Sequence, residues 1–76
     1  MIKEHDRVIL MKDLPAEGLV GGDVGTVVHI YPSGVAFEVE FMTLNGDTVA
    51  VVTIDSQDVR EAGQRDLPHA RELSRI

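Results

Sequence analysis

Short hydrophobic runs alternate with turn-forming residues along most of the chain. The clearest pattern lies in residues 36–42, where apolar and acidic side chains alternate: Phe37, Val39 and Phe41 with Glu38 and Glu40. Because successive side chains of a strand point to opposite faces of a sheet, this alternation predicts a half-buried β-strand. Four further runs rich in β-branched residues are predicted as strands, at residues 7–11, 24–31, 48–54 and 59–61.

Residues with turn-forming chemistry separate these predicted strands. Asn45 and Gly46 accept left-handed backbone dihedrals, so they predict a type I′ hairpin turn between the third and fourth strands. Residues 55–58, with the sequence DSQD, predict one helical turn before the last strand. A long loop is predicted after the first strand, because Pro15 and several glycines interrupt residues 12–22.

The number and spacing of these elements predict the fold class. Five short strands, a long first loop and a helical turn before the last strand are typical of an all-β fold, a small five-stranded SH3-like barrel at about residues 7–61. We expect residues 1–61 to form one domain. Its predicted core is Val8, Leu10, Leu19, Val24, Val27, Ile30, Phe37, Val39, Phe41, Val49, Val51, Ile54 and Val59.

Residues 62–76 differ in character and are predicted as a C-terminal tail. A short helix from Leu67 is the alternative, because Asp66 can cap it and an apolar residue recurs at every third position: Leu67, Ala70, Leu73 and Ile76. A helix of about ten residues is marginally stable without packing partners.

The glycine-rich phrase GGDVG, at residues 21–25, invites comparison with phosphate-binding loops. A dinucleotide-binding fingerprint needs G-x-G-x-x-G between a strand and a helix, whereas these glycines lie between a loop and a strand. A Walker loop needs a lysine, and no lysine occurs between residues 13 and 76. We therefore interpret the phrase as structural: Gly22 ends the loop, Asp23 accepts backbone N–H groups, and Gly25 permits a tight bend or a close approach to a neighbouring strand.

Charge narrows the choice of partners. The chain carries 13 acidic residues against 7 Lys and Arg, for a formal net charge of −6 at pH 7. Most of the acids lie in the predicted domain rather than in the tail. Nonspecific nucleic-acid binding depends on Lys and Arg that neutralise phosphates, so this charge disfavours it and favours a basic or neutral protein surface as partner.

Cysteine usage and the N-terminal sequence bear on the compartment. The absence of cysteine excludes disulfides, thiolate metal sites and cysteine nucleophiles, and it fits a reducing environment. Charged residues near the N-terminus leave no apolar signal peptide, and the apolar runs are far shorter than the ~20 residues that a membrane-spanning helix needs. We therefore expect a cytoplasmic protein without a membrane segment.

No combination of residues predicts catalysis. His5, His29 and His69 lack the spacing of metal ligands, and the serines have no nearby base. Glu38 and Glu40 share one strand face, but the solvent face of a small barrel provides little of the desolvation that acid–base chemistry requires. The sequence therefore predicts no catalytic residue, no metal site and no cofactor, and we expect the protein not to be an enzyme.

The candidates for partner binding combine apolar and acidic side chains: Leu14, Pro15, Glu17, Leu19, Tyr31, Glu38, Glu40 and Met42. Four of them lie in the predicted loop, where apolar side chains are unexpected unless they are covered. Two alternatives remain open for this loop. Either it folds back onto the core, or it forms an apolar binding patch together with Tyr31, Met42 and Leu44.

Two resemblances extend these expectations. The stretch GDVGTVVHIYPSGVAFEVEF resembles the strand–loop unit of KOW-type and other SH3-like barrels, which occur in ribosomal proteins, transcription factors and enzyme subunits. The longer stretch from Val8 to Arg60 resembles a bacterial family of stand-alone small domains of unknown function, with the pattern DLP…GL, GDxGTVV, (Y/F)EVEF, AVVT and DVR. This resemblance implies an SH3-like barrel and no established activity.

These observations lead to one expected function and one alternative. We expect a non-catalytic protein–protein interaction module with a basic or neutral partner, of the antitoxin or immunity type or an enzyme accessory protein. The alternative is a KOW-like nucleic-acid-binding domain, which the net charge of −6 disfavours. A homo-oligomer is compatible with either function.

Overall fold

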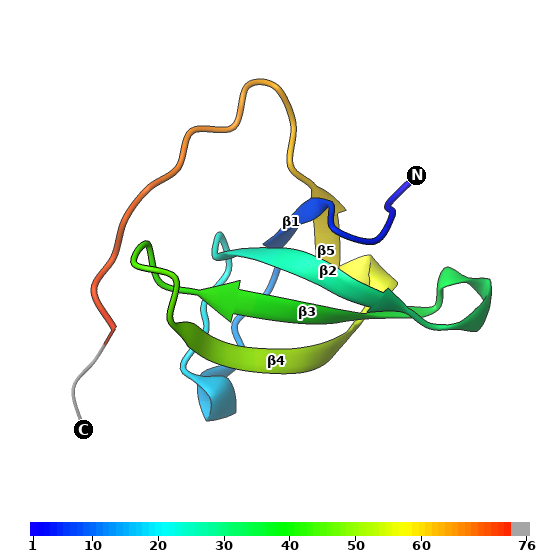
Figure 1. Cartoon of the computed structure of the whole chain (residues 1–76), viewed down its shortest axis with the longest axis horizontal. Coiled ribbons are helices and arrows are strands. Elements are labelled where there is room, and N and C mark those ends of the chain that lie inside the picture. Colours follow the sequence, from blue (N-terminus) through cyan, green and yellow to red (C-terminus); the bar gives the residue numbers. More distant parts are fainter. Residues whose placement is uncertain (74–76) are drawn as a thin grey trace.

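The computed structural model describes residues 1–73 and is all-β, as the sequence predicts (Figure 1). Its strands and single 3₁₀ turns follow one another as β1 (Arg7–Leu10), η1 (Pro15–Glu17), β2 (Val24–Ile30), η2 (Pro32–Gly34), β3 (Ala36–Met42), β4 (Thr48–Asp55), η3 (Ser56–Asp58) and β5 (Val59–Glu61). Within residues 1–73, no helix is long and apolar enough to cross a membrane.

The five strands form one antiparallel sheet with the order β4-β3-β2-β1-β5. The long loop between β1 and β2 and the 3₁₀ turn before β5 match the predicted SH3-like arrangement. Strands β4 and β5 are the two edges of the hydrogen-bonded sheet, yet Ile54 from β4 and Val59 from β5 belong to the same core cluster. The sheet therefore curves around a single core.

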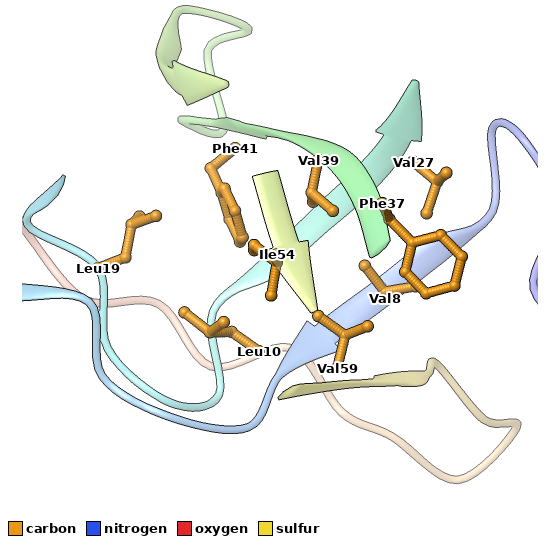
Figure 2. Packing of buried hydrophobic residues seen from close by; sticks show 9 residues of the cluster. All are labelled: Val8, Leu10, Leu19, Val27, Phe37, Val39, Phe41, Ile54 and Val59. Carbon is orange, nitrogen blue, oxygen red and sulfur yellow. The ribbon is translucent and has the colours of Figure 1, made fainter. Parts of the chain in front are cut away.

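Nine buried apolar side chains make up that core, and Figure 2 shows them converging between the strands. Val8, Val27 and Val39 are completely buried, one from each of three adjacent strands. In β3 the predicted alternation is confirmed, since Phe37, Val39 and Phe41 are all buried. Burial of this apolar surface is the main favourable contribution to folding. All nine residues are among the predicted core: Val8, Leu10, Leu19, Val27, Phe37, Val39, Phe41, Ile54 and Val59.

The prediction that Val24 lies in the core is wrong, because the inward position in this part of β2 is taken by Gly25. Gly25 pairs with Val8 on one side and Phe41 on the other, and Val24 points outward with 43% of its surface exposed. Further along β2 the register shifts between Val27 and His29. This β-bulge adds one residue to the strand, so Val27 and Ile30 both contact the core although three positions separate them.

The prediction that Val51 lies in the core is also wrong, because the opposite face of β4 points toward the core. The register pairs Ile54 with Phe37, Val52 with Val39 and Ala50 with Phe41, and Val51 is 50% exposed. A second register shift, next to Met42, leaves Val49 outside the regular pairing, and Val49 packs against the core as predicted. Since side chains alternate with a period of two, each bulge reverses which residues face inward.

The β3–β4 hairpin is confirmed, but its turn is not type I′. Asn45 does not adopt the positive φ that a type I′ turn requires, whereas Gly46 has a φ of 91°. The Thr43 N–H still pairs with the Asp47 carbonyl at 2.8 Å, so Leu44, Asn45 and Gly46 form a three-residue loop. Such loops need one left-handed residue at their end, which is Gly46.

The tail does not form the helix that was considered from Leu67. Residues 64–65 form a turn and residues 66–73 have no regular secondary structure. Leu67 is 89% exposed, so the apolar spacing does not correspond to a packed helical face. The carboxylate of Asp66, the expected helix cap, instead accepts hydrogen bonds from Arg60 and from the Gly63 N–H. Ile76, the last residue of the apolar pattern, lies outside the described residues.

Candidate functional site

The long loop after β1 folds back on the core, and this is the first of the two alternatives that the sequence left open for the loop. Leu14 and Leu19 form an isolated β-bridge, with Leu14 N–H to Leu19 O at 2.9 Å and the reverse hydrogen bond at 3.1 Å. Leu19 is buried in the core, and Leu14 packs against it. Pro15 and Glu17 lie in η1, at the exposed tip of the loop. Of the four loop candidates, these two are exposed, Leu14 is half-buried and Leu19 is buried.

The remaining candidates do not form one patch with the loop. Tyr31 directly follows β2 and lies beside the start of β3, where its N–H donates to the Ala36 carbonyl at 3.1 Å, whereas Met42 lies at the opposite end of β3. At about 3.3 Å of rise per residue, β3 separates Ala36 from Met42 by roughly 20 Å. The structure therefore divides the predicted site into two surfaces, one on the outer face of β3 and one beside the β3–β4 hairpin.

The first surface, which we name the acidic face, consists of Glu38 and Glu40 with the hydroxyl groups that hold them. The hydroxyls of Tyr31 and Thr53 both donate to Glu38 Oε1, at 3.1 Å and 2.5 Å. The Thr48 hydroxyl donates to Glu40 Oε2 at 2.6 Å. Because the neighbouring strand β4 and the residue that follows β2 provide these donors, the fold fixes both carboxylates in position on a solvent-facing strand surface.

The charge of the acidic face is not compensated by a neighbouring cation. In residues 1–73 no Lys or Arg nitrogen lies within 4.0 Å of the Glu38 or Glu40 carboxylate. The cross-strand neighbours of Glu38 are His29 and Thr53, and those of Glu40 are Thr26 and Val51. The arrangement can present two negative charges, with fixed geometry, to a positively charged group.

The second surface, which we name the hairpin groove, is an open space of about 700 Å³ that is bounded by the β3–β4 hairpin, the start of β2 and the tail. Most of its lining is apolar, and Leu44 at the hairpin tip is 95% exposed. Tail residues 68–73 lie along it, and Figure 1 shows the tail running from β5 around the sheet to this side of the molecule. The sheet and loop residues that line the groove include Leu19, Asp23, Val24, Phe41, Leu44 and Val49.

Arg71 attaches the tail to the groove through Asp23. Its Nε and Nη2 atoms donate to Asp23 Oδ1 and Oδ2 at 2.9 Å and 2.6 Å, and Nη2 also donates to the Gly18 carbonyl at 3.0 Å. The Val20 N–H donates to Asp23 Oδ2 at 2.9 Å, which confirms the predicted role of Asp23 as an acceptor in the loop. Partial burial raises the pKa of Asp23, but the hydrogen bonds from Arg71 and Val20 outweigh this effect and lower it overall.

Sequence reasoning did not identify Arg71 as a functional residue. It lies 48 residues from Asp23, in a segment without a strand or turn pattern, so no local signal predicts their contact. A second ion pair anchors the beginning of the tail, where Arg60 binds both carboxylate oxygens of Asp66 at 2.9 Å and 2.8 Å. The hydrogen bonds from Arg60 and from the Gly63 N–H lower the pKa of Asp66 to about 2.

Acid is expected to release the tail from the rest of the domain, because it weakens the ion pairs of Asp23 and Asp66. Both Asp23 and Asp66 have a folded-state pKa below the ordinary value of 3.8, so their ion pairs stabilise the attached tail above about pH 4 and are lost as the pH falls toward 2. Amide ¹⁵N relaxation of Ala70 should therefore become that of a mobile segment in this range. Amides of β3 provide the internal control, and an ordered tail beside an intact sheet at about pH 2 would contradict the prediction.

Metal binding has no candidate among the described residues, because residues 1–73 contain no group of three or more His, Asp or Glu side chains arranged to hold an ion.

Comparison with known proteins assigns the chain to a family. No curated protein and no solved structure matches the chain. A family model matches residues 4–61, which include all five strands and exclude the tail. The chain therefore belongs to the family described as Domain of unknown function (DUF4926).

Proposed function

We propose that the protein is a non-catalytic module that binds another protein through the acidic face. The observation that carries this proposal is that Glu38 and Glu40 are held by three hydroxyl groups and face solvent without a cation in contact. A structural ion pair would use their charge within the fold. Here the charge is left for an external group, and its position is already determined by the sheet.

Electrostatics indicate the chemistry of the partner. Carboxylates form their strongest hydrogen bonds with Arg and Lys, and Arg can bind two oxygens at once. The net charge of −6 attracts a basic surface and accelerates its association. Because the carboxylates are already ordered by hydrogen bonds, binding costs little further side-chain entropy. A partner with a basic patch fits this face, as in complexes of the antitoxin or immunity type or of an enzyme with an accessory protein.

The distribution of cations favours a protein partner over the alternative, a KOW-like nucleic-acid-binding domain. Phosphate binding requires Lys and Arg side chains that are free to displace counterions. Three of the six Lys and Arg residues in positions 1–73 are engaged by carboxylates of the chain: Lys12 by Asp58, Arg60 by Asp66 and Arg71 by Asp23. The described surface therefore offers phosphate few free cations.

The acidic face can be tested by removing its charge without removing its hydrogen-bond acceptors. In Glu38→Gln with Glu40→Gln, each side-chain carbonyl can still accept from the surrounding hydroxyl groups. A partner is first identified by cross-linking in cell extract, and the purified pair is then measured by calorimetry. We expect the double variant to weaken binding by about tenfold or more, because each truncated ion pair across an interface costs more than about 1.4 kcal/mol.

The matched control removes two charges elsewhere, with Glu4→Gln and Asp47→Asn. Both residues are exposed and lie outside the acidic face, so we expect the affinity to change by no more than about twofold. Equal affinity of the Gln double variant and the unsubstituted chain would exclude the acidic face as the interface. A salt-sensitive, submicromolar shift of single-stranded or duplex nucleic acid at physiological salt would instead favour the KOW-like alternative.

A further inference from the structure

The hairpin groove has two properties that the acidic face does not have, namely a mostly apolar lining and, at Asp23, a carboxylate that already binds an arginine. Leu44 and Met42 are exposed although both are large and apolar, which is typical of surfaces that contact another chain. Residues 68–73, an irregular, non-helical segment that includes this arginine, form one side of the groove. Every sheet and loop residue of the groove lies within the family match at residues 4–61, whereas this segment lies outside it.

The tail is held mainly by one side chain. All residues from 62 to 73 remain exposed, so the tail buries little apolar surface against the sheet. Arg71, in contrast, makes three hydrogen bonds, two to Asp23 and one to the Gly18 carbonyl. A single guanidinium group therefore fixes the position of the segment, whose apolar residues remain exposed.

The Asp23 carboxylate and the Gly18 carbonyl are oriented to accept hydrogen bonds from a guanidinium group. The Val20 N–H orients the Asp23 carboxylate, and Gly18 adopts a left-handed φ of 73° at the point where its carbonyl accepts from Arg71. A planar guanidinium can bind both carboxylate oxygens and a third acceptor in fixed directions, which the ammonium group of lysine cannot reproduce. The geometry therefore selects arginine over lysine.

We propose that the Asp23 carboxylate and the Gly18 carbonyl, at the edge of the hairpin groove, form an arginine-binding site, that the tail occupies this site through Arg71 as an intramolecular ligand, and that its external ligand is a non-helical segment of another protein. This segment carries an arginine that replaces Arg71 at Asp23 and an apolar side chain two residues later, at the position of Leu73, which also lines the groove. The site lies beside the hairpin and is independent of the acidic face, so the failure of either proposal leaves the other intact.

Because the tail is covalently joined to the domain, it can regulate the binding of an external segment. A tethered segment competes with an effective concentration in the millimolar range, so an external segment with the same contacts binds only weakly while the tail is attached. Removal of the Arg71 contacts should release the tail and make the Asp23 carboxylate and the Gly18 carbonyl available to another arginine. The affinity for an external peptide is therefore expected to rise when the tail is weakened, the opposite of what a simple loss of structure would produce.

The test uses the full chain with Arg71→Ala and a fluorescein-labelled peptide with the sequence of residues 62–73. Fluorescence anisotropy should show that the variant binds the peptide about tenfold or more tightly than the unsubstituted chain does. Arg65→Ala is the matched control, because Arg65 is an exposed tail residue with no carboxylate within 4.0 Å in the described part of the chain. This control should bind the peptide as weakly as the unsubstituted chain, and a peptide with Arg71→Lys should bind the Arg71→Ala variant less tightly than the original peptide.

A second substitution separates loss of the site from loss of the fold. Asp23→Asn retains an acceptor for the Val20 N–H but removes the charge, so added to Arg71→Ala it should abolish peptide binding while circular dichroism stays unchanged. Equally weak peptide binding by Arg71→Ala and the unsubstituted chain would overturn the proposal. Sedimentation that shows a dimer of the unsubstituted chain and a monomer of Arg71→Ala would also overturn it, because Arg71 would then bind Asp23 of a second copy.

Discussion

Replacement of Gly25 by alanine is expected to destabilise the fold by about 2 kcal/mol or more, a large effect for one methyl group. A Cβ atom at this position would lie 2.5 Å from Val39 Cγ1, 3.0 Å from Phe41 Cε1 and 3.1 Å from the Glu40 carbonyl oxygen. Val39 is fully buried, and the Glu40 carbonyl belongs to the strand paired with β2. Neither group can move without disturbing the core or the sheet.

Gly21→Ala is the matched control, because it adds the same methyl group to the same glycine-rich phrase. A Cβ at Gly21 would have its nearest neighbours at 3.7 Å to 3.8 Å, which is ordinary contact. This variant should be as stable as the parent or more stable by up to about 1 kcal/mol, since alanine restricts the unfolded chain. Urea denaturation followed by circular dichroism measures both variants, and equal midpoints would show that the strands tolerate wider spacing at Gly25.

Leu10→Ala is the second substitution with a large expected effect. Leu10 is 1% exposed and belongs to the central cluster in Figure 2, so truncation leaves a cavity and removes buried apolar surface. Substitutions of this kind cost about 2–5 kcal/mol. Small domains have total stabilities near the low end of about 5–15 kcal/mol, so we expect much of the Leu10→Ala population to be unfolded at room temperature.

The same chemical change at Leu67 provides the comparison. Leu67 lies in the tail and is 89% exposed, so its replacement by alanine should lower the free energy of unfolding by no more than about 0.5 kcal/mol. Thermal unfolding and urea denaturation of both variants, followed by circular dichroism, report the difference directly. A Leu10→Ala variant as stable as Leu67→Ala would mean that the core collapses around the missing side chain, contrary to the packing of this cluster.

Local pattern was sufficient to predict the elements of the fold. Strict alternation in residues 36–42 identified β3 and both of its faces, and therefore also the position of Glu38 and Glu40 on the acidic face. Turn residues identified the hairpin at Asn45 and Gly46. These predictions succeed because side-chain period and turn dihedrals depend on a few adjacent residues.

The inward face of β2 and β4 could not be predicted in the same way. Val24 and Val51 have the chemistry of core residues, but the bulges at Val28 and Val49 change which positions face inward. A bulge depends on how two strands pair, and neither strand carries that information alone. The same reason explains Gly25, whose close contacts are with β3 and not with its own neighbours in sequence.

The chain sequence is sufficient to specify its all-β class, the order and approximate limits of its strands, its acidity and the two glutamates of the acidic face. These features follow from composition and from contacts between residues that are close in sequence. The inward register of two strands, the extended course of the tail and the contact between Arg71 and Asp23 arise only when the chain is folded. They depend on atoms from segments far apart in sequence, and the free energy of such contacts is set by their arrangement in space.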